Sequence, residues 1–243
     1  MQQYAALSAN PLATLQNTTL EVNALPQVAD ATRVDLWFAF YNNAMVIDQS
    51  ETMAAALAGG PDKYCAIQRP MLVSCMRGYN LPVGVRHLAT NNVQAGAINA
   101  DLWVTEIQTG CSVLILDWGG DTYSMIHLQP SDDTQFNLLG RGLMGLGYYT
   151  KYITGEHLFR NAYKNTWLKQ ELTTIVQNTG AVPRYYILVQ SMFEASRGRV
   201  TQVVGVKQNG RFQFFRQRMQ GVNSTVQALN WCGWYSLMPY KAY

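Results

Sequence analysis

Cys111 and His127 are the two residues whose types and spacing could do chemistry together. A thiolate attacks acyl carbons, and an imidazole beside it can take the thiol proton. Gly110 stands directly before the cysteine, where a glycine permits unusual backbone angles and leaves room for a substrate carbonyl. The backbone N–H of Cys111 would then help to form an oxyanion hole. The pair predicts nucleophilic catalysis at an acyl group, and the alternative is an ordinary buried cysteine.

A hairpin is needed to bring these two residues together. Residues 102–108, 111–118 and 122–128 are short, apolar and bounded by turns, so each predicts a strand. Residues 118–121, Trp-Gly-Gly-Asp, predict the turn between the second and third strands. With Cys111 at the start of one strand and His127 near the end of the next, the two side chains would meet at the end of the hairpin opposite this turn.

The rest of the chain predicts more strands than helices. Asn209-Gly210 lies between two β-prone runs over residues 199–219, which predicts a hairpin with a type I′ turn. Further strands are expected at 71–77, 84–90, 185–190 and 231–237. Helices are expected at 50–60, which has a serine cap and a glycine stop, and at 156–178, which has amphipathic spacing. The pattern predicts one α+β domain over 1–243, a sandwich rather than a doubly wound parallel sheet.

The composition favours a core-rich globule. Of 243 residues, 48% are hydrophobic and 14% are charged, and no apolar run is long enough to span a membrane. The N-terminal residues show no signal peptide, so we expect a bacterial cytoplasmic location before any leaderless delivery to a host cell. The four cysteines, Cys65, Cys75, Cys111 and Cys232, are sparse and form no CxxC pair, which favours reduced thiols.

The charge is distributed unevenly along the chain. Residues 1–139 hold twelve acidic and five basic residues, whereas residues 140–243 hold three acidic and thirteen basic ones. This predicts either a solvated basic surface or a face that meets an acidic protein or RNA. Arg211, Arg216 and Arg218 are the candidates for substrate binding on that face, and a purely binding role for it remains an alternative to catalysis.

Two other kinds of site are disfavoured. Gly140, Gly142 and Gly145 match a dinucleotide fingerprint, but the surrounding sequence lacks the βαβ frame that this motif needs, so a loop is the better interpretation. Cys65, Cys75 and His87 do not have the spacing of zinc ligands. We therefore expect no metal and no cofactor.

The order of Thr105, Cys111 and His127, written TEIQTGC…MIHL, resembles the Thr–Cys–His glutamine deamidases. This family includes the catalytic domain of cytotoxic necrotizing factor, the chemoreceptor glutamine deamidase and Burkholderia lethal factor. Family members carry Ser-Gly-Cys or a close variant at the nucleophile, and this chain has Thr109-Gly110-Cys111. The resemblance is strongest over residues 100–137 and is greatest to Burkholderia lethal factor, which shares a Gly-Gly turn, here Gly119-Gly120.

The resemblance implies a β-sandwich of mixed sheets flanked by helices. It also implies that Cys111 is the nucleophile, that His127 is the base, and that Thr105 orients the histidine ring. The implied reaction deamidates a glutamine of a protein substrate, such as a host translation factor or a GTPase. A cysteine protease or acyltransferase with the same pair is the alternative chemistry. Asp101, Asp117 and Asp121 are the alternatives to Thr105, which could instead be a solvent-facing strand residue.

Overall fold

The fold of the chain is known from a computed structural model. It describes residues 2–28, 31–41, 43–59, 65–74, 76–78, 93–108, 112–129, 183–191, 198–221 and 223–233. The helices of this part are α1 (Gln2–Ala9), α2 (Pro11–Asn17) and α3 (Glu51–Ala58). Its strands are β1 (Thr19–Val22), β2 (Thr32–Tyr41), β3 (Ala44–Asp48), β4 (Cys65–Ser74), β5 (Met76–Gly78), β6 (Val93–Gln94), β7 (Leu102–Thr105), β8 (Ser112–Gly119), β9 (Thr122–Gln129), β10 (Tyr185–Gln190), β11 (Val200–Gln208), β12 (Arg211–Gln220), β13 (Asn223–Ala228) and β14 (Cys232–Gly233).

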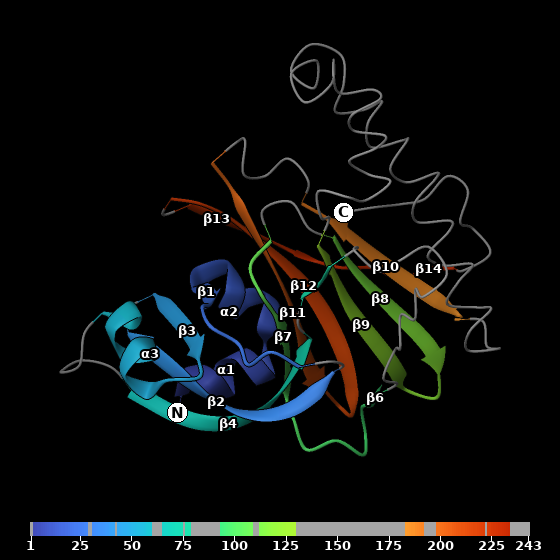
Figure 1. Ribbon diagram of the computed structural model, residues 1–243, viewed down its shortest axis with the longest axis horizontal. Helices are drawn as coiled ribbons and strands as arrows, with labels where there is room; N and C mark the ends of the chain where they lie inside the picture. The colour runs from blue at the N-terminus through green and yellow to red at the C-terminus, as the bar shows by residue number, and fades with distance from the viewer. Residues whose placement is uncertain are drawn as a thin grey trace, which may run out of the picture.

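These strands form two mixed sheets. The larger sheet has the order β1-β3-β2-β4-β7-β11-β12-β13, and the smaller one has the path β14-β10-β8-β9-β5 with β6 also on β9. Three pairs are parallel, namely β1 with β3, β4 with β7 and β5 with β9, and the other pairs are antiparallel. The single-domain α+β sandwich predicted from the sequence is therefore confirmed (Figure 1).

An apolar core joins the facing sides of the two sheets. Trp103 and Phe214 of the larger sheet belong to the same buried cluster as Val113, Met125 and Ile187 of the smaller sheet. Alternate residues of a strand point to opposite faces, so the neighbours of these residues point away from this core. Helices α1 and α2 cover the other face of the larger sheet (Figure 1). A second buried cluster contains residues of these helices and of that face.

Both predicted hairpins are confirmed. β11 and β12 pair along their full lengths, and the turn residues Asn209 and Gly210 have φ of 51° and 79°. β8 and β9 pair around Gly120 and Asp121, which have φ of 58° and 57°, and the register of this ladder shifts between Asp117 and Gly119. Positive φ at both central positions is what a type I′ turn requires. The pairing of β8 with β9 fixes which residue of β8 lies opposite His127.

The other predicted elements have mixed outcomes. The helix after Ser50 is confirmed as α3, whose first turn is capped by the Ser50 side chain, and the strand at 185–190 is confirmed as β10. The strand predicted over 102–108 is shorter, since β7 ends at Thr105. In place of one strand over 71–77, residues 71–74 end β4 in the larger sheet and residues 76–77 belong to β5 in the smaller one. Cys232–Gly233 is the described part of the late strand. The segments 84–90 and 156–178 and the glycine motif at 140–145 lie outside the described residues.

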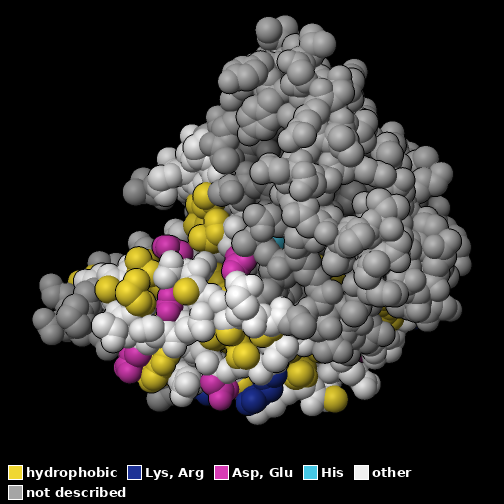
Figure 2. All heavy atoms as spheres, viewed as in Figure 1, with side chains coloured by type: hydrophobic (Ala, Val, Ile, Leu, Met, Phe, Trp, Pro, Cys, Tyr) yellow, Lys and Arg dark blue, Asp and Glu magenta, His cyan; other side chains and the backbone are white. Residues whose placement is uncertain are grey.

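Figure 2 shows the charged side chains on one face of the molecule. In the view of Figure 2, Asp and Glu side chains are spread over the N-terminal elements, while Lys and Arg side chains gather at the lower edge. No helix in the described part of the chain has the length and apolar character needed to cross a membrane.

Candidate active site

Thr105 and His127 form the centre of the candidate site. The hydroxyl Oγ1 of Thr105 lies 2.5 Å from Nδ1 of the His127 ring, and both residues are fully buried. Thr105 ends β7 of the larger sheet, and His127 lies near the end of β9 in the smaller sheet. The contact therefore links the two layers of the sandwich. A solvent-facing Thr105, the alternative considered from the sequence, is wrong.

The alternation of the strands places these two side chains opposite each other. Thr105 follows Trp103 at a spacing of two, and His127 follows Met125 in the same way. Trp103 and Met125 both belong to the core between the sheets, so Thr105 and His127 continue that face. The polar pair thus extends the apolar core toward one end of the sandwich.

The register of β8 and β9 relates His127 to the predicted nucleophile. Val113 pairs with His127, and Ser112 pairs with Leu128. Cys111 is the residue before Ser112 in the chain, two positions before the partner of His127. Cys111 itself, like Gly110, lies outside the described residues. Their roles as nucleophile and as oxyanion-hole glycine remain predictions.

Burial determines the charge state of His127. It lowers the pKa of the ring from its usual 6.5 to about 3, because the charged form would lose its hydration. The ring is therefore neutral at pH 7 unless an anion lies beside it. When Nδ1–H donates to Thr105 Oγ1, the lone pair is on Nε2. Nε2 is buried and has no hydrogen-bond partner in the described part of the chain. In this tautomer Nε2 is unprotonated and is able to accept a proton.

Gln202 supports Thr105 from the neighbouring strand. Its Nε2 donates to the backbone oxygen of Thr105 at 2.5 Å, and the residue is fully buried. The bond joins β11 to the end of β7, where the regular ladder between these strands has stopped at Val104. Sequence reasoning missed Gln202. The only local signal was a glutamine inside an otherwise apolar run, "TQVVGV".

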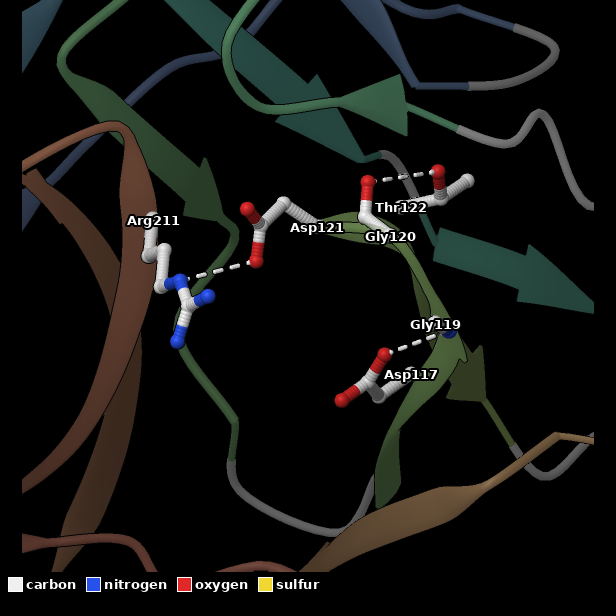
Figure 3. A network of polar contacts seen from close by, with 6 residues as sticks. All are labelled: Asp117, Gly119, Gly120, Asp121, Thr122 and Arg211. Atoms are coloured by element: carbon white, nitrogen blue, oxygen red, sulfur yellow. Dashed lines mark hydrogen bonds and ion pairs between the residues drawn. The ribbon is translucent and has the colours of Figure 1, made fainter.

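The three aspartates proposed as alternatives to Thr105 lie elsewhere. Asp101 is exposed before β7, while Asp117 and Asp121 are at the β8–β9 turn (Figure 3). Asp117 accepts a hydrogen bond from the Gly119 N–H at 2.7 Å and stabilises that turn. His127 is five residues along β9 from Thr122, about 17 Å at the usual rise of a strand. The Thr105 hydroxyl, and not one of these carboxylates, contacts the ring.

The candidate arginines do not form one group. Arg211 lies beside the β11–β12 turn, is exposed, and its Nε donates to Asp121 at 2.9 Å (Figure 3). Arg216 and Arg218 are half-buried on the same face of β12 as Phe214, which points toward the smaller sheet. Arg216 donates to Gln227 of β13 at 2.7 Å. Arg211 is therefore at the end of the molecule that holds the β8–β9 and β11–β12 turns, which we call the turn end. Arg216 and Arg218 are farther along β12.

The turn end has a cavity of its own. It has a volume of about 900 Å³, and its lining includes Asp117, Asp121, Arg184, Arg211 and Trp231. It is remote from His127 along β9. No three His, Cys, Asp or Glu side chains among the described residues converge in a way that could hold a metal ion.

Comparisons with known proteins found similarity to solved structures. No protein-family model and no curated protein matches the sequence. Among solved structures, the chain is similar to the C-terminal domain of CNFy from Yersinia pseudotuberculosis, with 9% identity and a TM-score of 0.39. The similarity covers 96% of this chain and 97% of that chain. A TM-score this low carries no argument about activity, so a functional assignment has to rest on the site itself.

Proposed function

We propose that the chain is a cysteine-dependent deamidase, a protein-glutamine glutaminase that acts as a bacterial toxin or effector. The observation that carries the proposal is the buried Thr105–His127 contact, in which Nε2 has no hydrogen-bond partner among the described residues and His127 pairs with β8, the strand that follows Cys111. A buried histidine held by one ring nitrogen, with the other left open, has the arrangement of a general base. The Thr–Cys–His order in the sequence supports the same assignment.

The first half of the reaction forms a thioester. His127 Nε2 accepts the Cys111 thiol proton as the sulfur attacks the carboxamide carbon of a substrate glutamine. Because the resting ring is neutral, this proton transfer accompanies the attack and produces imidazolium next to the new oxyanion. The backbone N–H of Cys111 is the first donor to that oxyanion. The imidazolium then protonates the departing nitrogen, ammonia leaves, and the carbonyl re-forms as a thioester.

The second half releases glutamate. His127, neutral again, takes a proton from water as the water oxygen attacks the thioester carbon. Collapse of this intermediate expels the Cys111 sulfur, which recovers its proton from the imidazolium. No cofactor or metal takes part in these steps. Thr105 keeps the ring in one orientation through both halves, since its hydroxyl can accept from Nδ1–H throughout.

The test is a mass measurement on protein glutamines. Proteins of a host-cell extract are incubated with the wild-type chain or with Cys111→Ser, and glutamines are scored for the one-dalton gain that accompanies conversion to glutamate. We expect a gain that depends on Cys111 at a small set of sites. Cleaved peptides in place of that gain would indicate a protease. An equally active Cys111→Ser protein would end the proposal.

A further inference from the structure

Gln108, three residues after Thr105 in the chain, and Thr201 form a second set of buried polar groups. Gln108 is fully buried and Thr201 is 1% exposed. Neither the amide oxygen and nitrogen of Gln108 nor the hydroxyl of Thr201 has a hydrogen-bond partner in the described part of the chain. Buried polar side chains are paired in the great majority of cases, so unpaired groups on two adjacent residues require an explanation.

The backbone fixes the position of this pair. Gln108 N–H donates to the Thr201 oxygen at 2.7 Å, and Thr201 N–H donates to the Gln108 oxygen at 2.9 Å. Residues that exchange both bonds in an antiparallel bridge lie directly opposite each other, with their side chains on the same face. Gln108 therefore stays buried through a rigid bridge to β11, although β7 has already ended.

The side chains of Gln108 and Thr201 point to the face of the larger sheet that carries Thr105. Thr201 precedes Val203 by two residues in β11, and Val203 belongs to the core between the sheets. Thr201 and Gln108 thus point to the same side of the larger sheet as Thr105. Gln108 is also three residues before Cys111 in the chain. The side-chain groups of Gln108 and Thr201 and the Nε2 of His127, which have no partner in the described part of the chain, belong to this end of the sandwich. In the sequence, Cys111 comes directly before Ser112, the first residue of β8.

The chemistry of the unpaired groups matches that of a primary carboxamide. A glutamine side chain offers one acceptor oxygen and an NH₂ donor, and a substrate carboxamide offers the same two in the opposite sense. Resting on the proposed deamidase function, we infer that Gln108 is the carboxamide-recognition residue of the site. Its Nε2 donates to the substrate carbonyl oxygen and, with the Cys111 N–H, to the oxyanion that forms there. Its Oε1 accepts from the substrate NH₂, and the Thr201 hydroxyl is the neighbouring partner for the same amide.

Gln217 provides a matched control for this role. It too is a fully buried glutamine, but it is on the helix side of the sheet and its side chain is paired in the fold. Its Nε2 donates to the Leu15 and Thr18 oxygens, and its Oε1 accepts from the Leu20 N–H. Replacement by methionine removes the amide at either position while keeping a side chain of similar length.

The experiment compares Gln108→Met with Gln217→Met in two measurements. In urea unfolding, we expect Gln217→Met to lower the midpoint and Gln108→Met to leave it unchanged or raise it, because only Gln217 loses bonds made within the fold. In deamidation of a glutamine identified by the one-dalton gain, we expect Gln108→Met to lose about 10²–10³-fold in rate, the usual effect of removing one oxyanion donor. Gln217→Met, measured where it is folded, should keep the wild-type rate.

The two measurements separate this inference from the function on which it rests. A midpoint that falls as far in Gln108→Met as in Gln217→Met would show that the Gln108 amide is paired in the fold, and would overturn the inference whatever the activity. A full deamidation rate in Gln108→Met would overturn it while leaving the deamidase proposal intact. A wild-type chain with no deamidase activity would overturn both. Thr201→Val, which replaces the hydroxyl by a methyl group, should behave as Gln108→Met does, with a smaller loss of rate.

Discussion

Acidification should destabilise the chain through His127 to an extent that follows from its burial. The pKa of the ring is about 6.5 in the unfolded chain and about 3 in the fold. Between these values the unfolded state binds a proton that the folded state does not, so the free energy of unfolding falls as the pH is lowered through this window. At pH 5 the expected loss relative to pH 7 is about 2 kcal/mol, since each unit of pKa difference corresponds to about 1.4 kcal/mol.

The assay is urea unfolding at pH 7, 6 and 5 for the wild type and for His127→Asn. Asparagine keeps a polar group toward Thr105 but does not titrate in this range, so the other histidines and the carboxylates contribute equally to both proteins. We expect the stability difference between wild type and variant to shrink by about 2 kcal/mol from pH 7 to pH 5. Parallel profiles for the two proteins would show that His127 is not a buried neutral ring, and would refute the reasoning.

Three further changes test contacts at the site, in the core and at the turn end. Thr105→Val should cost about 1–3 kcal/mol by leaving the buried ring nitrogen unpaired, and should lower deamidation, whereas Thr105→Ser should retain most of both. Gly205→Ala should cost about 1–3 kcal/mol in urea unfolding, because an added Cβ would lie 2.8 Å from Phe214 Cε1 in the packed core. Asp121→Asn breaks the exposed ion pair with Arg211, and the expected loss is below about 1 kcal/mol with deamidation unchanged. A large activity loss in this last variant would contradict the separation of the turn end from the site.

Local sequence signals predicted the hairpins well. Asn209-Gly210 and Gly120-Asp121 are residues that tolerate positive φ, and each turn formed where those residues stand. The position of His127 at the far end of its hairpin followed from the same reasoning. Sequence alone could not show which face of β8 is buried against the other sheet, because β8 is apolar on both faces from Val113 to Leu116. Alternation was therefore uninformative in that strand.

Local sequence signals could not predict which strands lie next to each other in the larger sheet. β7 lies between β4 and β11, so the neighbours of Thr105 come from segments about 30 residues earlier and 100 residues later in the chain. For this reason Gln202 and the Gln108–Thr201 bridge were not predicted, although Thr105 was identified by its spacing from Cys111. Helices α1 and α2 were missed as well. α1 lacks the acidic first turn and basic last turn that mark helix ends, and α2 is only seven residues long.

The most direct test of the central claim is whether Cys111 and His127 lie side by side in solution. A bifunctional haloketone alkylates a thiol and an adjacent imidazole, and cleavage after Asp117 and Asp121 separates the two residues into different fragments. We predict that the fragment containing Cys111 stays joined to the fragment containing His127, and that His127→Asn abolishes the cross-link while Cys111 is still alkylated. Alkylation of Cys111 without any cross-link to His127 in the wild type would contradict the pairing on which the proposed chemistry depends.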